Sequence, residues 1–332
     1  MPVHQEVFRS GRFDKVLFMA AFVLIAAGML MVYSSSSYNA GDKYGNSFHF
    51  VVQQMIGLAV GLTLLVFFLR VPRPIYKTPQ VAFGLMLITL VLLLACFGMP
   101  TFANTNRLVQ LGAFRFQPSE LAKVSLVLFL AYIIDKKQDR LKGFRSLALP
   151  VGGLLAVVLL IIKEPDYGTA ALVFLIGLTL LVLGGMKSKF LIILCLIALI
   201  IFTAYLMSAP YRWERFLTFL FPDHDPQGAG FQVRQSKLAV GRGGLFGVSL
   251  GESTQKLYFL PCAHTDFIYA IIGEEFGLLG TLAMLAVFIL ILWRGMVIAR
   301  RAPDTFSRIA AAGLTLMITA QALINITVVL GL

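Results

Sequence analysis

Long apolar stretches alternate with short polar connections along almost the whole chain. A helix that crosses a bilayer needs about twenty mostly apolar residues, and we identify nine such stretches. Inside lipid only helices and closed barrels satisfy every backbone polar group, and stretches this long are not barrel strands. We therefore predict an all-α integral membrane fold, a polytopic bundle of nine transmembrane helices. The predicted spans cover residues 16–34, 49–69, 80–98, 118–134, 146–163, 168–185, 190–208, 276–293 and 309–331.

Composition supports a membrane protein. Of the 332 residues, 58% are hydrophobic and 13% are charged, whereas about a quarter of the residues in a soluble domain are charged. The net charge of +12 is compatible with nucleic-acid binding, but the basic residues cluster in the short connections between apolar stretches. Such clusters are typical of loops that meet anionic lipid. We expect membrane lipid as a partner and no nucleic acid.

The basic residues also predict an orientation. With the N-terminus in the cytoplasm, the short inner segments hold seventeen lysines and arginines, and the short outer segments hold four. Cytoplasmic loops of membrane proteins carry such an excess. We predict a cytoplasmic N-terminal segment, 1–15, and a transmembrane domain, 16–332. This domain includes a large outer loop, 209–275, between spans seven and eight.

Acidic residues near the spans are the first place to look for chemistry, because membrane bundles rarely keep charge without a use for it. Pro118 opens the fourth span, and Glu120 and Lys123 lie three residues apart on one helix face. A helix start with a local ion pair explains this spacing. The alternative is a charged feature at the outer mouth of the bundle that positions an anionic head group.

A second acidic group precedes span six, where Glu164, Pro165 and Asp166 follow one another. Proline and aspartate favour a turn and a helix start, so we interpret this group as structural.

The third group closes the long loop. A continuous helix over 262–293 would be about 48 Å long at 1.5 Å per residue, which is too long for one perpendicular crossing. We therefore expect a separate half-buried helix over 265–275 and a break near Gly277. Asp266 would lie at its start, partly desolvated and near His264, where a carboxylate is placed to act as a general base. A helix-capping Thr-Asp pair is the alternative.

The same loop contains a glycine-rich run, 241–247. It is not a dinucleotide-binding loop, because Phe246 occupies the place of the last required glycine and no strand precedes the run. Arginines, amides and flexible backbone at an outer membrane face suit a phosphate-bearing lipid instead.

Taken together, the motifs of the chain resemble the SEDS family of bacterial cell-wall polymerases, which includes FtsW and RodA. The resemblance extends from the first span to the last residue, and its details are more similar to FtsW than to RodA. The motifs are FQPSELAK (116–123), EPDYGTA (164–170), PYRWERFLTFLFP (210–222), STQKLYFLP (253–261), HTDFIYAIIGEEFG (264–277) and NITVVLGL (325–332).

The resemblance implies roles for individual residues. Asp266 matches the essential aspartate of the family, Glu120 and Lys123 match an important acid–base pair, and Arg107 matches an arginine that precedes this pair. The resemblance also places four residues in the substrate cavity: Gln235, Ser236, His264 and Thr265.

The chain departs from the family pattern at two positions, because Cys262 replaces an expected glutamate and Leu108 replaces a common tryptophan. The family also continues with a proline-rich loop and a tenth span.

The implied activity is that of a peptidoglycan glycosyltransferase, which polymerises lipid II into glycan strands at the periplasmic face of the inner membrane. Asp266 would take the proton of the attacking hydroxyl, and Arg107, Lys123 or a divalent cation (Mg²⁺ or Mn²⁺) would stabilise the departing undecaprenyl diphosphate. The implied partners are a class B penicillin-binding protein and other membrane proteins of the division complex at the septum. A lipid II flippase, a non-catalytic division scaffold and a RodA-type elongation polymerase are the alternatives.

Overall fold

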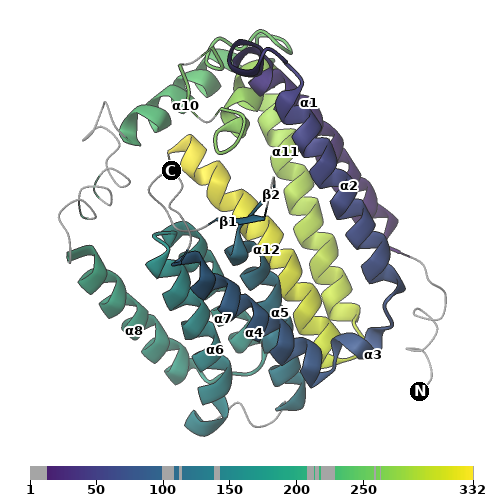
Figure 1. Ribbon diagram of the computed structural model, residues 1–332, viewed down its shortest axis with the longest axis vertical. Helices are drawn as coiled ribbons and strands as arrows, with labels where there is room; N and C mark the ends of the chain where they lie inside the picture. The colour runs from purple at the N-terminus through teal and green to yellow at the C-terminus, as the bar shows by residue number, and fades with distance from the viewer. Residues whose placement is uncertain are drawn as a thin grey trace. The chain divides into compact units, whose positions relative to one another are not determined.

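A computed structural model describes residues 13–98, 108–111, 114–137, 143–207, 213, 217, 229–257, 259–261 and 263–331. The protein is almost entirely helical in this part of the chain, as the apolar pattern predicts (Figure 1).

Each of the nine predicted spans coincides with a helix. Seven of these helices, within the described residues, are long and apolar enough to cross a membrane. The other two are α5, which carries four charged residues, and α7, which has 17 residues. The count of nine spans therefore stays a prediction. The nine helices are α1 (Lys15–Tyr44), α2 (His49–Arg70), α4 (Pro79–Cys96), α5 (Pro118–Lys136), α6 (Phe144–Lys163), α7 (Tyr167–Leu183), α8 (Ser188–Met207), α11 (Ile268–Arg301) and α12 (Thr305–Leu330).

Four smaller elements were not predicted from the sequence. They include a short antiparallel hairpin in which Val109 pairs with Phe116, directly before α5. They also include a 15-residue helix inside the long loop. The four are α3 (Arg73–Tyr76), β1 (Val109–Leu111), β2 (Phe114–Phe116) and α10 (Ala229–Gly243).

The chain divides into two compact units, which we describe separately. Unit 1 comprises residues 1–62, 215–294 and 322–332, and unit 2 comprises residues 63–214 and 295–321.

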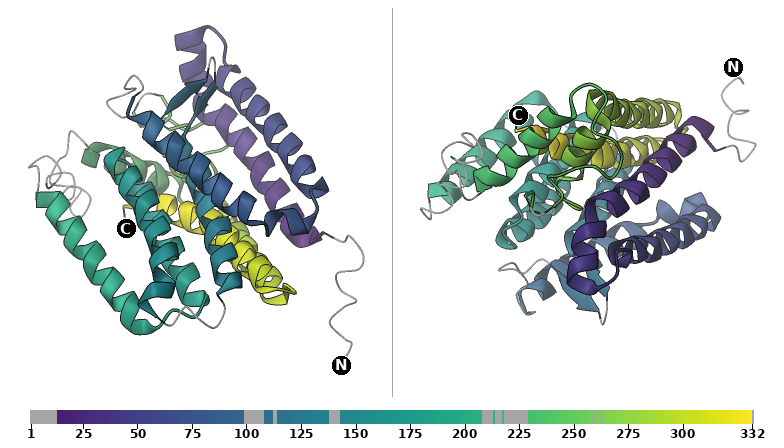
Figure 2. Two further views of the ribbon diagram at one scale, coloured as in Figure 1. Left: turned by 60° about the horizontal axis from the view of Figure 1, so that its bottom comes forward. Right: turned by 90° about the horizontal axis from the view of Figure 1, so that it is seen from above.

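Unit 2 has its core among α4, α5, α6 and α7, which pack side by side (Figure 2). Small residues bring these helices close together. A Cβ atom added to Gly177 of α7 would lie 2.5 Å from Leu154 of α6, and one added to Gly153 of α6 would lie 2.5 Å from Phe129 of α5. Small residues are typical of helix interfaces in membranes, because they let backbones approach.

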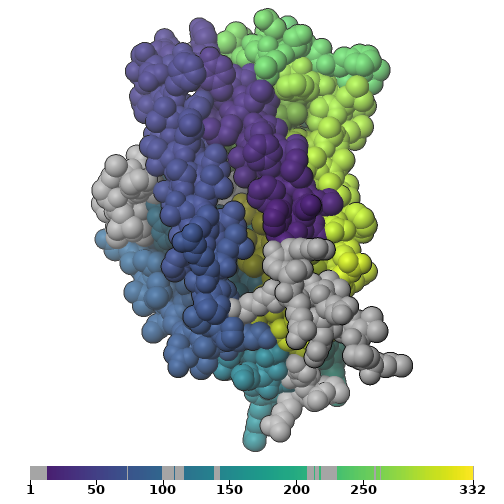
Figure 3. Space-filling view, turned by 90° about the vertical axis from the view of Figure 1, so that its right-hand side faces the viewer, coloured from purple at the N-terminus to yellow at the C-terminus, as the bar shows by residue number. Residues whose placement is uncertain are grey.

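Unit 1 contains α1, the first part of α2, α10, most of α11 and the end of α12. Figure 3 shows α1 and the first part of α2 side by side on one face. Asp14, the N-cap of α1, accepts a hydrogen bond from Leu17 and pairs with Arg294 of α11. The core of the unit gathers around residues 267–272 at the start of α11.

The predicted break in α11 is present, because Gly277 has φ 65° and ψ −160°. It separates a short segment, 268–276, from a long segment, 278–301. A break leaves backbone groups without intrahelical partners, and the residues after α10 supply them. The amides of Val248 and Ser249 donate to the carbonyls of Glu274 (3.0 Å) and Glu275 (3.2 Å). The carbonyl of Gly244 accepts from the Leu278 amide at 2.9 Å.

This approach is so close that it requires glycine. A Cβ atom on Gly243 would lie 1.9 Å from the Gly273 carbonyl oxygen, and one on Gly247 would lie 2.1 Å from the Glu275 carbonyl oxygen. The glycine-rich run therefore packs against the break in α11, a role that the sequence did not reveal.

We predict that Gly243→Ala lowers the stability of the protein by roughly 1–3 kcal/mol, because the added methyl group overlaps backbone that cannot move aside. Thermal unfolding in detergent measures the change. Gly241→Ala is the matched control, since that position, also in α10, has open space around it. The control is expected to be neutral or to stabilise by up to about 1 kcal/mol, and equal losses in both variants would contradict the packing argument.

Candidate functional site

Asp266 lies two residues before the short segment of α11, close to its predicted place at a helix start. Its backbone carbonyl accepts a hydrogen bond from Nδ2 of Asn325 in α12 at 3.0 Å. The expectation of a partly desolvated carboxylate was wrong, because the residue is exposed. The next side chain, Phe267, enters the core instead, so neighbouring positions face opposite sides.

His264 lies beside Asp266, as predicted. Its ring packs against Phe50 of α2, with the centroids 4.4 Å apart. Its Nδ1 atom is buried and has no hydrogen-bond partner among the described residues. Burial lowers the pKa of His264, and the charge of Asp266 opposes this effect. Burial therefore favours the neutral imidazole, which can accept a proton or a hydrogen bond. Thr265, between the two, is exposed.

Two further predicted residues lie on α10. Ser236 is fully buried, and its hydroxyl donates to the carbonyl of Val329 near the end of α12. In this arrangement the hydroxyl packs α10 against α12. Gln235 is half-buried. Their roles in binding a substrate stay predictions.

Glu120 and Lys123 form the predicted ion pair, in unit 2. The Nζ atom of Lys123 lies 2.8 Å from both carboxylate oxygens of Glu120 and 2.6 Å from Oε1 of Gln321. Lys123 is 3% exposed, whereas the side chain of Glu120 is 51% exposed. The group that an external ligand meets is therefore the carboxylate, and the ammonium holds it from inside.

Two residues singled out from the sequence, Arg107 and Cys262, lie outside the described residues. Leu108 is half-buried just before β1. The described residues bring together no group of three histidine, cysteine or acidic side chains that fits a metal ion, so a role for Mg²⁺ or Mn²⁺ stays a prediction and we derive no step through a metal.

The turn between α6 and α7 has the structural role predicted for Asp166. Its carboxylate caps α7 by accepting from the Thr169 amide at 3.2 Å, and it also accepts from Nε2 of Gln117 at 2.9 Å. Glu164 in the same turn is unexpected. It is 0% exposed, and neither carboxylate oxygen has a partner among the described residues. Burial raises the pKa of Glu164 to about 7; the neighbouring Cys96 thiol lowers it and the charge of Asp166 raises it.

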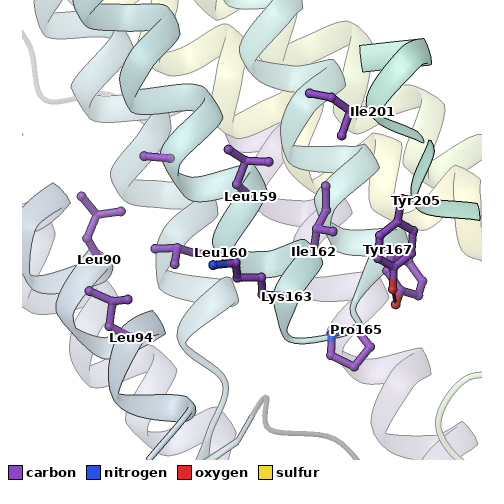
Figure 4. Close-up of a pocket in the computed structure, with 11 residues that line it drawn as sticks. Leu90, Leu94, Leu159, Leu160, Ile162, Lys163, Pro165, Tyr167, Ile201 and Tyr205 are labelled. Carbon is purple, nitrogen blue, oxygen red and sulfur yellow. Dashed lines mark hydrogen bonds between the residues drawn. The ribbon is translucent and has the colours of Figure 1, made fainter. Parts of the chain in front are cut away.

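Unit 2 also has an apolar groove of about 820 Å³ among α4, α6 and α8 (Figure 4). Leucines from α4 and α6 form its walls. The side chain of Lys163, at the end of α6, extends into the groove. Tyr167 and Tyr205 also line the groove, and their hydroxyls form a hydrogen bond with each other. A long apolar chain with a polar head group fits this arrangement. The remaining lining residues are Ala156, Ile162, Pro165 and Ile201.

We predict that stability depends on pH through Glu164. Because its folded pKa is raised above the ordinary value of 4.5, folding favours the neutral acid. Its contribution is complete below about pH 4.5 and is lost as the pH rises through about 7. The melting temperature in detergent should fall over this window, and Glu164→Gln should abolish that part of the fall. Glu252→Gln, at an exposed acid, is the control; an unchanged pH profile for Glu164→Gln would contradict the assignment.

Comparison with known proteins now places the chain. The model of the family described as "Cell cycle protein", which covers FtsW, RodA and SpoVE, matches residues 14–332. The probable peptidoglycan glycosyltransferase FtsW of Geobacter sulfurreducens is 37% identical over 97% of this chain and 87% of its own length. Stage V sporulation protein E of Bacillus subtilis is 36% identical over 96% of this chain and 88% of its own length.

Solved structures agree. A chain from a peptidoglycan synthase complex that coordinates polymerisation and crosslinking matches with a TM-score of 0.80 and 26% identity, over 97% of this chain and 89% of that chain. The rod shape determining protein RodA of Thermus thermophilus shares the fold, with a TM-score of 0.66 and 24% identity over 95% and 85% of the two chains. This protein therefore belongs to the FtsW, RodA and SpoVE family of integral membrane cell-cycle proteins.

Proposed function

We propose that this protein is a peptidoglycan glycosyltransferase that polymerises lipid II during cell division. Family membership and the names of the FtsW relatives support this activity. The excess of basic residues in the predicted inner loops supports an N-terminus in the cytoplasm and a site at the periplasmic face of the inner membrane. The similarity to FtsW supports placement at the septum.

The observation that carries the proposal is the exposed carboxylate of Asp266, on backbone held by Asn325 and near His264, whose neutral form burial favours. A sugar hydroxyl is a poor nucleophile, so a base must remove its proton during attack. The 4-hydroxyl oxygen of one lipid II forms a bond to the anomeric carbon of the growing strand, and its proton passes to Asp266. The bond from that carbon to the diphosphate breaks, undecaprenyl diphosphate leaves with the electron pair, and the anomeric configuration inverts.

The Glu120–Lys123 pair has a different part in the proposal. Because Lys123 is buried, it does not meet a ligand directly; it orients the exposed Glu120 carboxylate, which does. That carboxylate is placed to accept hydrogen bonds from sugar hydroxyls or peptide amides of the substrate. Direct contact between Lys123 and a diphosphate would require the pair to open. Arg107, predicted to stabilise the diphosphate, keeps that role in the proposal.

The groove in unit 2 is the proposed site for a polyprenyl chain. Its walls are leucine and isoleucine side chains, and Lys163 supplies a positive charge for a phosphate group. A class B penicillin-binding protein within the division complex would crosslink the new strands. The similarity to a chain from a peptidoglycan synthase complex, with a TM-score of 0.80, supports such a partner.

We predict that Asp266→Asn lowers lipid II polymerisation at least about 100-fold, because the amide cannot take the proton. The assay compares glycan ladders made by purified wild-type and variant proteins with their penicillin-binding partner. Folding should be unchanged, since the side chain is exposed, and the melting temperature checks this.

Glu252→Gln, at another exposed acid of unit 1, should keep full activity. A ladder of normal strength from Asp266→Asn would refute the assignment of the base. If the wild-type protein makes no ladder but moves lipid II across vesicle membranes, the flippase replaces the polymerase.

We also predict that Glu120 and Lys123 act as a unit. Glu120→Gln and Lys123→Met should each lower kcat/KM for lipid II at least about tenfold, and the double variant should lose no more than the worse single variant. Such non-additivity is typical of residues that act through one interaction. Losses that multiply in the double variant would show independent roles.

A further inference from the structure

Two glutamates at the far end of the short segment of α11 are almost completely buried. Glu274 is 0% exposed and Glu275 is 1% exposed, and no step of the proposed reaction uses either. An isolated buried carboxylate is strongly unfavourable, so each must be compensated. Their partners come from α1 and from the loop that precedes the short segment.

Glu275 belongs to a buried polar cluster with Lys256 and Ser34. The Nζ atom of Lys256 donates to Oε1 of Glu275 at 2.8 Å, to the Gly251 carbonyl at 2.6 Å and to Oγ of Ser34 at 3.2 Å. Ser34, in α1, donates to the Glu275 carboxylate at 2.7 and 2.8 Å. Lys256 is 5% exposed, and all three of its ammonium protons have acceptors. The cluster therefore ties the short segment to α1 and to the loop before it.

Glu274 fixes the same loop from the other side. Its carboxylate accepts from the Thr254 amide at 3.1 Å, the Gln255 amide at 3.3 Å and the hydroxyl of Ser253. The loop that carries Lys256 is therefore itself held by the short segment. The short segment and the loop therefore hold each other in place, through Glu274 on one side and Lys256 on the other.

Asp266 lies at the opposite end of this short segment, where Asn325 holds its carbonyl. The helical part, 268–275, spans about 11 Å at 1.5 Å per residue, and Asp266 lies two residues before its first residue. A tilt of about 5° at the clustered end would move Asp266 by about 1 Å, and displacements of that size reduce turnover by about 100-fold in other enzymes.

We propose that Ser34, Lys256 and Glu275 are positioning residues for Asp266, which they orient through the short helical segment. The inference rests on the proposed function, in which Asp266 is the base. It assigns a role in turnover to a charged cluster that the short helical segment separates from the base.

The test uses Glu275→Gln and the double variant Lys256→Met/Glu275→Gln in the full-length protein. The single variant leaves the Lys256 ammonium buried without its counter-charge, so it is expected to lower both stability and kcat. The double variant removes both charges at similar volume and should recover the melting temperature. Its kcat per folded molecule should stay at least tenfold below wild type, with KM for lipid II unchanged.

Asp14→Asn is the matched control, because it breaks another ion pair of unit 1, with Arg294, away from the short segment. It should keep wild-type kcat. If the double variant recovers kcat together with the melting temperature, the cluster contributes only stability and the proposal is wrong.

Hydrogen exchange of residues 266–276 provides a readout that does not depend on activity. The double variant should exchange at least tenfold faster there than wild type or Asp14→Asn, and unchanged exchange would overturn the proposal. Failure of the proposed polymerase function would give a different result. The wild-type protein would then make no glycan, while the double variant would still exchange faster than wild type over residues 266–276.

Discussion

Backbone amides and carbonyls buried away from water need partners from the protein itself, and α11 meets this constraint where it breaks at Gly277. The loop after α10 supplies those partners, and the same hydrogen bonds restrict the conformation of the loop. These hydrogen bonds fix the direction of the short segment and therefore the position of Asp266. A continuous helix would need no such loop, but it would also carry Asp266 along the axis of the long segment.

The charged groups discussed above fall into two classes, apart from Glu164, which is buried without a partner for its carboxylate among the described residues. Lys123, Lys256, Glu274 and Glu275 are buried and each has close partners of opposite charge or several hydrogen bonds. Asp266 and Glu120 are exposed. Buried charges of the first kind resist rearrangement, because a group that loses its partner inside the protein is strongly destabilised. The exposed carboxylates are the ones that can exchange water for a ligand.

The sequence predicted the long helices well because a long apolar stretch is a local signal, and the break near Gly277 followed from helix length. It did not predict α10, whose mixed polar and apolar residues resemble those of a loop. The partners of Lys256 were also missed, since Ser34 is 222 residues away and no local pattern links them. Asp266 was expected to be partly desolvated at the start of a half-buried helix; the structure buries Phe267 and leaves Asp266 exposed. Glu164 had a visible signal, an acid before proline, but its burial depends on packing.

The glycines around the break have one more consequence. Gly243, Gly247 and Gly277 each face backbone atoms, so a side chain added at any of them overlaps atoms that a second substitution cannot remove. A substitution at one of these glycines therefore cannot be compensated by a second substitution elsewhere. We expect the local backbone conformation to change little during evolution, because each single step toward another conformation would introduce a steric overlap.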